Sequence, residues 1–111
     1  MLGNLEATRE WGHPKDYVRA MVMILNQEQP NDFVCATGKS HSVRDLCDYT
    51  FSSLGLNYQD YLGVDKKYYR PEELKHLKGD SSRLKSIGFE SEYTFETMLD
   101  EMIEHWENVY K

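Results

Sequence analysis

LGNLEATREWGHPKDYV, residues 2–18 of the chain, joins an extended segment to the start of a helix. Its first residues have the character of the end of an extended segment. From Lys15 to about Gln27, apolar residues recur at helical spacing. Asp16 falls in the first turn of that helix, where the helix dipole favours an acidic side chain. The apolar positions of the helix are Tyr17, Val18, Met21, Val22, Ile24 and Leu25.

Three more helices are predicted from their end signals. Ser42, with an acid three residues later, resembles a capping box, and Gly55 ends the helix that it opens. The polar residues 80–82 cap a short helix that closes at Gly88, and Thr94 caps a long amphipathic helix with one acidic face.

The extended part of the chain is shorter. The apolar run at residues 33–36, bounded by turn residues, predicts a buried strand. Residues 57–69 predict a loop followed by a short strand. We therefore predict the α/β class: one small domain, residues 1–111, that mixes helices with short strands.

Composition narrows the function classes. The chain has 111 residues, 40% of them hydrophobic, and a formal net charge of −6, which argues against general binding to nucleic acid or to anionic membranes. No apolar run approaches the roughly 20 residues that span a bilayer, and no signal-peptide pattern opens the chain. Two cysteines are too few for a disulfide framework, so we predict reduced thiols and a cytoplasmic protein.

Three motifs lie in order along the chain: residues 2–18, residues 32–44 with DFV, ATG and HSVR, and residues 68–74, YYRPEEL. Together they resemble the GDP-mannose 4,6-dehydratases, a family of extended short-chain dehydrogenases/reductases (the NAD-dependent epimerase/dehydratase superfamily). Glu10 and Pro14 depart from the family pattern. The resemblance covers only the last third of enzymes roughly three times this size. It implies the C-terminal, substrate-binding part of an extended Rossmann-type enzyme, without its nucleotide-binding half.

Enzymes of this family use NADP to convert GDP-mannose to GDP-4-keto-6-deoxymannose, on the route to GDP-fucose and related deoxyhexoses. Neither the glycine-rich turn that binds NADP nor the catalytic Tyr-x-x-x-Lys pair occurs in this sequence. We therefore expect no catalytic residues, no cofactor bound to this chain alone and no activity in isolation. The alternative is a non-enzymatic interaction module, or half of a split enzyme, that pairs with a separate Rossmann chain or forms a homo-oligomer.

The resemblance implies four substrate-binding residues. Arg9 would contact the nucleotide diphosphate, unless it is a surface arginine paired with a neighbouring glutamate. Arg70 would be a second diphosphate contact and Glu73 would accept hydrogen bonds from the ribose hydroxyls, unless the two form an ordinary ion pair in a turn. Asn4 would bind the guanine edge or hold a local turn, two readings of equal weight. The four histidines show no metal-ligand spacing, so we predict no metal site.

Overall fold

The computed structural model describes residues 1–70 and 76–110. The helices are α1 (Pro14–Leu25), α2 (Val43–Ser53), α3 (Ser82–Ser86) and α4 (Phe95–Val109), and the strands are β1 (Thr8–Glu10) and β2 (Ser40–Ser42). Two 3₁₀ helices, η1 (Tyr58–Asp60) and η2 (Lys66–Tyr68), follow α2. This mixture of helices and short strands confirms the predicted fold class.

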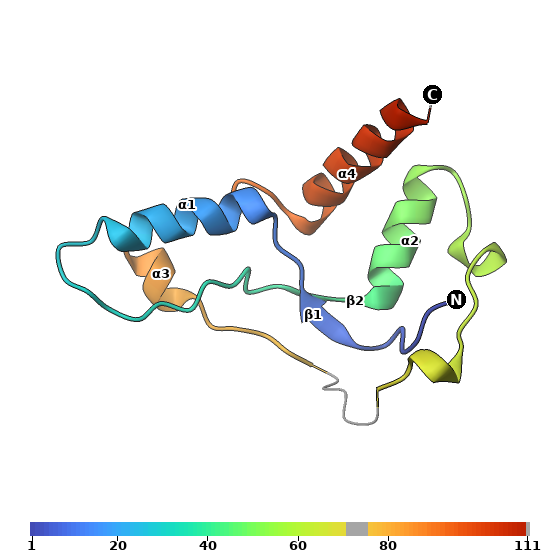
Figure 1. The fold of residues 1–111 in the computed structure, drawn as a ribbon, viewed down its shortest axis with the longest axis horizontal. Coiled ribbons are helices and arrows are strands. Elements are labelled where there is room, and N and C mark those ends of the chain that lie inside the picture. Colours follow the sequence, from blue (N-terminus) through green and yellow to red (C-terminus); the bar gives the residue numbers. More distant parts are fainter. Residues whose placement is uncertain (71–75, 111) are drawn as a thin grey trace.

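A two-stranded antiparallel sheet lies at the centre of the molecule (Figure 1). Thr8 pairs with Ser42, Arg9 with His41 and Glu10 with Ser40. Each strand leads into a helix: β1 into α1 after three residues, and β2 directly into α2. The sheet therefore fixes where both helices begin.

The helix starts agree with the cap signals in the sequence. Ser42 and Asp45 form a complete capping box on α2, and Thr94 forms one with Thr97 on α4. Helix α1 begins differently, because the ring of His13 accepts the hydrogen bond from the Lys15 N–H. At α3, only one of the predicted cap residues 80–82 acts as expected: Asp80 accepts from the Ser82 N–H, whereas the side chain of Ser81 makes no cap bond.

Two small hydrophobic cores form, one at each side of the sheet. The first contains the buried residues Ala20, Leu84 and Phe89, and the second contains Phe95, Met98 and Leu99. Partly buried side chains complete them: Met23, Ile24, Phe33, Cys35 and Ile87 in the first, and Trp11, Leu46 and Tyr49 in the second.

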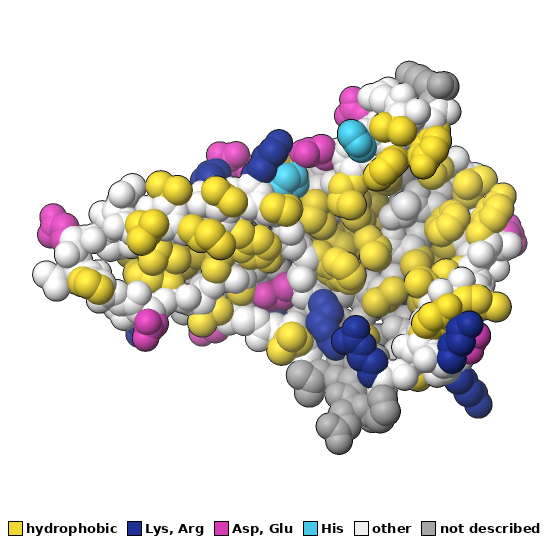
Figure 2. All heavy atoms as spheres, in the orientation of Figure 1, with side chains coloured by type: hydrophobic (Ala, Val, Ile, Leu, Met, Phe, Trp, Pro, Cys, Tyr) yellow, Lys and Arg dark blue, Asp and Glu magenta, His cyan; other side chains and the backbone are white. Residues whose placement is uncertain are grey.

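The molecule is flat and extended, measuring 53 × 39 × 17 Å. Its radius of gyration is 16.9 Å, whereas a compact domain of this length has a value of roughly 13 Å. The thinnest dimension leaves room for little more than one layer of helices, which are about 10 Å across. Much of the apolar surface therefore stays exposed, as the hydrophobic side chains over α1 in Figure 2 show.

The apolar stripe of α1 does not face a core in this chain. Val18, Met21, Val22 and Leu25 are 56%, 60%, 54% and 82% exposed. They lie at i, i+3, i+4 and i+7, which is the spacing of a helix face that normally packs against another element. We call these four residues the α1 stripe.

The strand predicted at residues 33–36 is wrong for the described part of the chain. This segment runs beside α1 and α3 without pairing to either strand of the sheet, and its residues form no backbone–backbone hydrogen bonds. Phe33 and Cys35 pack on the first core, while Val34 between them is 53% exposed. The side chains therefore alternate as in a strand, but the partner that a strand requires is not supplied by the described residues.

A second difference concerns residues 64–69. A short strand was expected there, but residues 66–68 form η2, which Asp65 caps by accepting the Lys67 N–H. Only Val64 takes part in an isolated bridge, parallel to Leu2. Within the described residues, no helix has both the length and the apolar character needed to cross a membrane.

Candidate functional site

Two distant segments that carry the predicted binding residues lie side by side. Leu2 forms an isolated β-bridge with Val64, and Thr8 forms another with His76. In both bridges the two segments of the chain run parallel. The two ends of residues 2–8 therefore lie beside residue 64 and residue 76 (Figure 1). Asn4 and Arg9 belong to the first segment, and Arg70 to the second.

Backbone hydrogen bonds hold the two segments in register at one end. The Leu2 N–H donates to the carbonyl of Gly63 and the Asp65 N–H donates to the carbonyl of Leu2, both at 2.8 Å. At the other end, Oγ1 of Thr8 lies 2.6 Å from Nδ1 of His76. The close fit depends on Gly3, because a Cβ there would lie 2.6 Å from the carbonyl oxygen of Tyr68.

Asn4 holds a local turn in this structure. Its Oδ1 accepts the Glu6 N–H at 3.0 Å. This is the second of the two roles that the sequence left open, and it leaves the side-chain NH₂ group as a donor for other partners. The neighbouring acid, Glu6, forms an ion pair with Arg44 at the start of α2.

Arg44 anchors the first segment to α2. Its Nε donates to Oε1 of Glu6 at 2.8 Å and its Nη1 donates to the hydroxyl of Tyr58 at 2.9 Å. These hydrogen bonds, above all the one with Glu6, raise the pKa of Arg44. The Arg44 N–H also donates to the carbonyl of Leu5 at 3.0 Å. Sequence reasoning assigned Arg44 only to a motif and missed this structural role.

Arg9 is half-buried in the middle of β1, opposite His41. Its Nη1 donates to the carbonyl of Thr8 at 2.6 Å. One of the two neighbouring glutamates considered as partners for Arg9, Glu6, is paired with Arg44, and Oε1 of the other, Glu10, accepts the Gly38 N–H. Arg9 directly follows Thr8, the β1 residue that bridges His76.

Arg70 is exposed and follows η2 by two residues. Glu73 lies outside the described residues. The basic residues nearby in the chain are Lys66 and Lys67 on η2, of which Lys67 pairs with Asp65. The exposed position of Arg70 suits a residue that meets a ligand from solvent.

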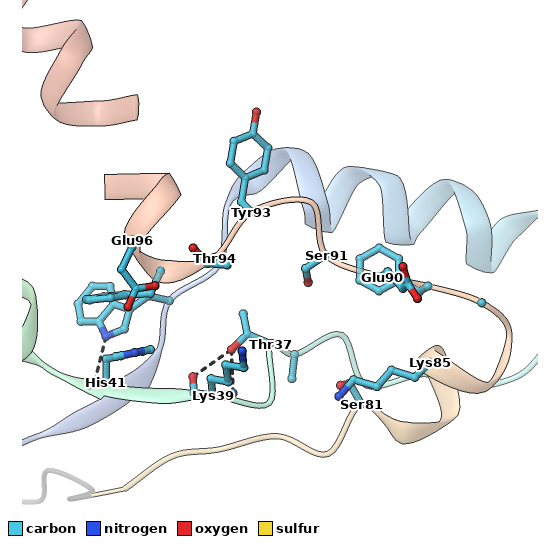
Figure 3. A pocket seen from close by; sticks show the side chains of 15 residues that line it. Thr37, Lys39, His41, Ser81, Lys85, Glu90, Ser91, Tyr93, Thr94 and Glu96 are labelled. Atoms are coloured by element: carbon cyan, nitrogen blue, oxygen red, sulfur yellow. Dashed lines mark hydrogen bonds between the residues drawn. The ribbon is translucent and has the colours of Figure 1, made fainter. Parts of the chain in front are cut away.

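A polar cavity of about 680 Å³ lies beside β2 (Figure 3). Thr37, Lys39 and His41 come from the segment that leads into β2, and Ser81 and Lys85 come from the region of α3. Residues 88–91 and 93–96 close it and contribute two acids, Glu90 and Glu96.

The charges around this cavity balance, since two lysines face two glutamates. That balance favours a neutral polar occupant over a phosphate. The Oγ of Ser81 is buried there without a hydrogen-bond partner among the described residues. Sequence reasoning missed this cavity because most of its walls come from two segments, residues 36–41 and 81–96, that lie 40 or more positions apart. The described residues contain no group of three His, Cys, Asp or Glu side chains that could hold a metal ion.

Solved structures show the class of fold. The chain matches UDP-glucose 4-epimerase from Thermotoga maritima with a TM-score of 0.84 and 20% identity, over 100% of this chain and 35% of that one. It also matches dTDP-glucose 4,6-dehydratase from Bacillus anthracis, solved with NAD, with a TM-score of 0.79 and 18% identity. This match covers 96% of this chain and 33% of that one. The fold is therefore that of one portion of an extended short-chain dehydrogenase/reductase.

Comparison of sequences identifies the family more specifically than the fold does. The profile of the family described as GDP-mannose 4,6 dehydratase matches residues 1–102. GDP-mannose 4,6 dehydratase 1 of Arabidopsis thaliana is 43% identical, over 93% of this chain and 29% of its own length. The human GDP-mannose 4,6 dehydratase is 37% identical, over 92% of this chain and 32% of its own length. The chain belongs to the GDP-mannose 4,6-dehydratase family, and it spans about a third of the length of these relatives.

The contact at Gly3 gives a test of the site's geometry. We expect Gly3→Ala to push residues 64–68 away, because the added methyl group meets the Tyr68 backbone. Amide hydrogen exchange at Leu2 and Asp65 should then accelerate, as measured by NMR. Leu2→Ala is the matched control, since it shortens a partly exposed side chain and keeps both backbone bonds. Equal exchange in both variants would contradict the proposed fit.

Proposed function

We propose that this chain provides the GDP-mannose-binding residues of a 4,6-dehydratase and is inactive on its own. The observation that carries the proposal is the pair of parallel bridges that place Leu2 beside Val64 and Thr8 beside His76. That alignment brings Arg9 and Arg70 onto adjoining segments in a chain whose family match covers both. Glu73, between Arg70 and His76 in the sequence, belongs to the same proposed site.

The chemistry of these residue types suits a nucleoside diphosphate sugar. A guanidinium group presents a planar fork of donors that matches phosphate oxygens and keeps its charge at any working pH. In the proposed site Arg9 and Arg70 contact the diphosphate, Glu73 accepts from the ribose hydroxyls, and the amide NH₂ of Asn4 donates to the guanine edge.

The described residues do not fit NADP. A dinucleotide site needs a glycine-rich turn between a strand and the N-terminus of a helix. Between β1 and α1 there is one glycine, Gly12, and a Cβ there would collide with the ring of Tyr17, so this glycine serves internal packing. Strand β2 enters α2 directly, and Ser42 occupies the helix end with its own cap. These features support a chain that does not bind the cofactor by itself.

Catalysis by the isolated chain is therefore expected to be absent. Purified protein incubated with GDP-mannose and NADP should form no 4-keto-6-deoxy sugar nucleotide, as followed by chromatography of the reaction mixture. The Arabidopsis relative, assayed in parallel, is the positive control. Turnover by this chain alone would overturn the proposal.

Arg70 tests the proposed site directly. We expect Arg70→Ala to weaken GDP and GDP-mannose binding roughly 10- to 150-fold, because a hydrogen bond to a charged group contributes about 1.5–3 kcal/mol. Lys66→Ala is the matched control, since it removes one exposed positive charge four residues away and no ion pair. NMR titration at millimolar ligand measures all three proteins. Equal affinities, or no binding by any of them, would contradict the assignment.

A second candidate function rests on a different observation. The α1 stripe is exposed, and residues 33–36, which pair with no strand among the described residues, pack Phe33 and Cys35 on the core that α1 shares. A companion sheet could use each of them, because one is an extended segment suited to strand pairing and the other is an apolar helix face. In this reading the chain is half of a split enzyme, and the companion is a Rossmann-type chain that holds NADP.

Co-purification tests this second reading. The companion can be represented by the Arabidopsis relative truncated to lack the region that this chain matches. We expect the two to co-elute, and Val22→Asp to separate them by placing a charge in the apolar contact. Val109→Asp on α4 is the matched control, because Val22 and Val109 are 54% and 53% exposed. Failure of the wild-type chain to co-elute would reject the split-enzyme reading.

A further inference from the structure

An apolar groove runs between α2 and α4, away from the proposed substrate site. Its volume is about 610 Å³, and the described residues that line it are mostly aliphatic or aromatic, with Thr50 and Glu107 among the exceptions. The side chains that shape it include Phe51, Leu54, Leu99, Met102, Trp106 and Tyr110. Figure 2 shows hydrophobic side chains continuing along α4 toward its C-terminal end.

The groove exists because α4 is longer than its partner. Helix α2 has 11 residues and α4 has 15, so α4 extends about 6 Å further. At the start of α4, Met98 and Leu99 are 7% and 5% exposed. Further along the same face, Met102 and Trp106 are each 52% exposed and Tyr110 is 82% exposed. An exposed tryptophan and methionine in one groove are typical of binding surfaces.

The surroundings of the groove are acidic. Helix α4 carries Glu96, Asp100, Glu101, Glu104 and Glu107 and contains neither lysine nor arginine. Helix α2 adds Asp45 and Asp48, and its one cation, Arg44, is paired with Glu6. Lys15 and His13 offset the charge of Glu101, but they lie at the start of α1. The end of α4 that forms the groove keeps its negative charge.

The outer wall of the groove also lies beyond the family match. The family profile ends at residue 102, whereas Ile103, Trp106 and Tyr110 follow it. Its inner wall, which includes Phe51, Leu54 and Leu99, lies within the family match.

We propose that this groove binds an amphipathic helix of a partner protein, with lysine or arginine flanking its apolar face. A groove between two helices accepts the apolar face of a third helix, which makes contact at i, i+3 and i+4 positions. The acidic surroundings favour basic flanks and raise the on-rate at low salt. A second copy of this chain fits less well, because its α4 brings the same negative charge.

A designed peptide pair tests the proposal. The probe is a fluorescent amphipathic peptide of leucine and lysine, about 18 residues or five turns long, and its counterpart has glutamate at every lysine position. We expect the lysine peptide to bind the wild-type chain in an anisotropy titration, more weakly as salt increases, and the glutamate peptide not to bind.

Two methionine variants locate the binding site. We expect Met102→Gln to weaken binding of the lysine peptide about tenfold or more, because it places an amide in the apolar groove. Met21→Gln on α1 is the matched control, with 60% exposure against 52% for Met102, and should bind like wild type. Far-UV circular dichroism checks that both variants keep their helices.

Three outcomes would overturn the proposal: equal binding of both peptides, no binding of the lysine peptide, or a loss in Met21→Gln instead of Met102→Gln. Sedimentation of the chain alone addresses the second-copy alternative. A dimer that Met102→Gln dissociates would show that a second copy occupies the groove. GDP titration of Met102→Gln should match wild type, which separates this surface from the substrate site.

Discussion

The carboxylate of Asp16 joins the two sides of the molecule. It is 5% exposed and accepts the N–H groups of Glu92 and Tyr93 at 2.9 and 3.2 Å. Arg19, one turn along α1, pairs with the same carboxylate and also donates to the carbonyl of Glu90. Because a buried carboxylate is tolerated only when its oxygens are bonded, α1 and the loop before α4 are held in one arrangement. Thr94 then caps α4 immediately after this loop, so the position of Asp16 sets the direction of α4.

That arrangement explains why the chain folds as a thin layer with two small cores. Each core contains only three fully buried hydrophobic residues, and the sheet between them has two short strands. A chain of this size that buries so little leaves whole helix faces in contact with solvent. The α1 stripe and the groove beside α4 are two such faces, on opposite sides of Asp16. The α1 stripe suits packing against a sheet, whereas the groove beside α4 suits a helix.

The proposed substrate site depends on a different set of interactions. Residues 2–8 are fixed on one side by α2, through Arg44 and Glu6, and on the other by the segment from residue 64. Gly3 allows the second contact, because any side chain would strike the Tyr68 backbone. Rigid support on both sides lowers the entropy lost when Arg9 binds an anion. The polar cavity beyond β2 has balanced charges and is therefore separate from this diphosphate site.

Local signals in the sequence determined the helices. Ser42 and Thr94 cap where their hydroxyls predict, and Gly55 and Gly88 adopt the positive φ angles expected just after α2 and α3. These features depend on neighbours within four residues, and so they can be read from the chain alone. The family motifs are also legible in the sequence, since they are patterns of residue type and order.

Only the tertiary structure decided what each helix face and extended segment contacts. Residues 33–36 have the composition of a buried strand, but a strand forms only when another chain segment supplies hydrogen bonds. Asp16 has the position of a simple first-turn acid, and its bonds to residues 92 and 93 span more than 70 positions. The approach of Thr8 to His76 and the cavity walls are equally non-local. The sequence by itself therefore determined the family and the helix ends, while long-range packing alone decided which surfaces meet and which stay exposed.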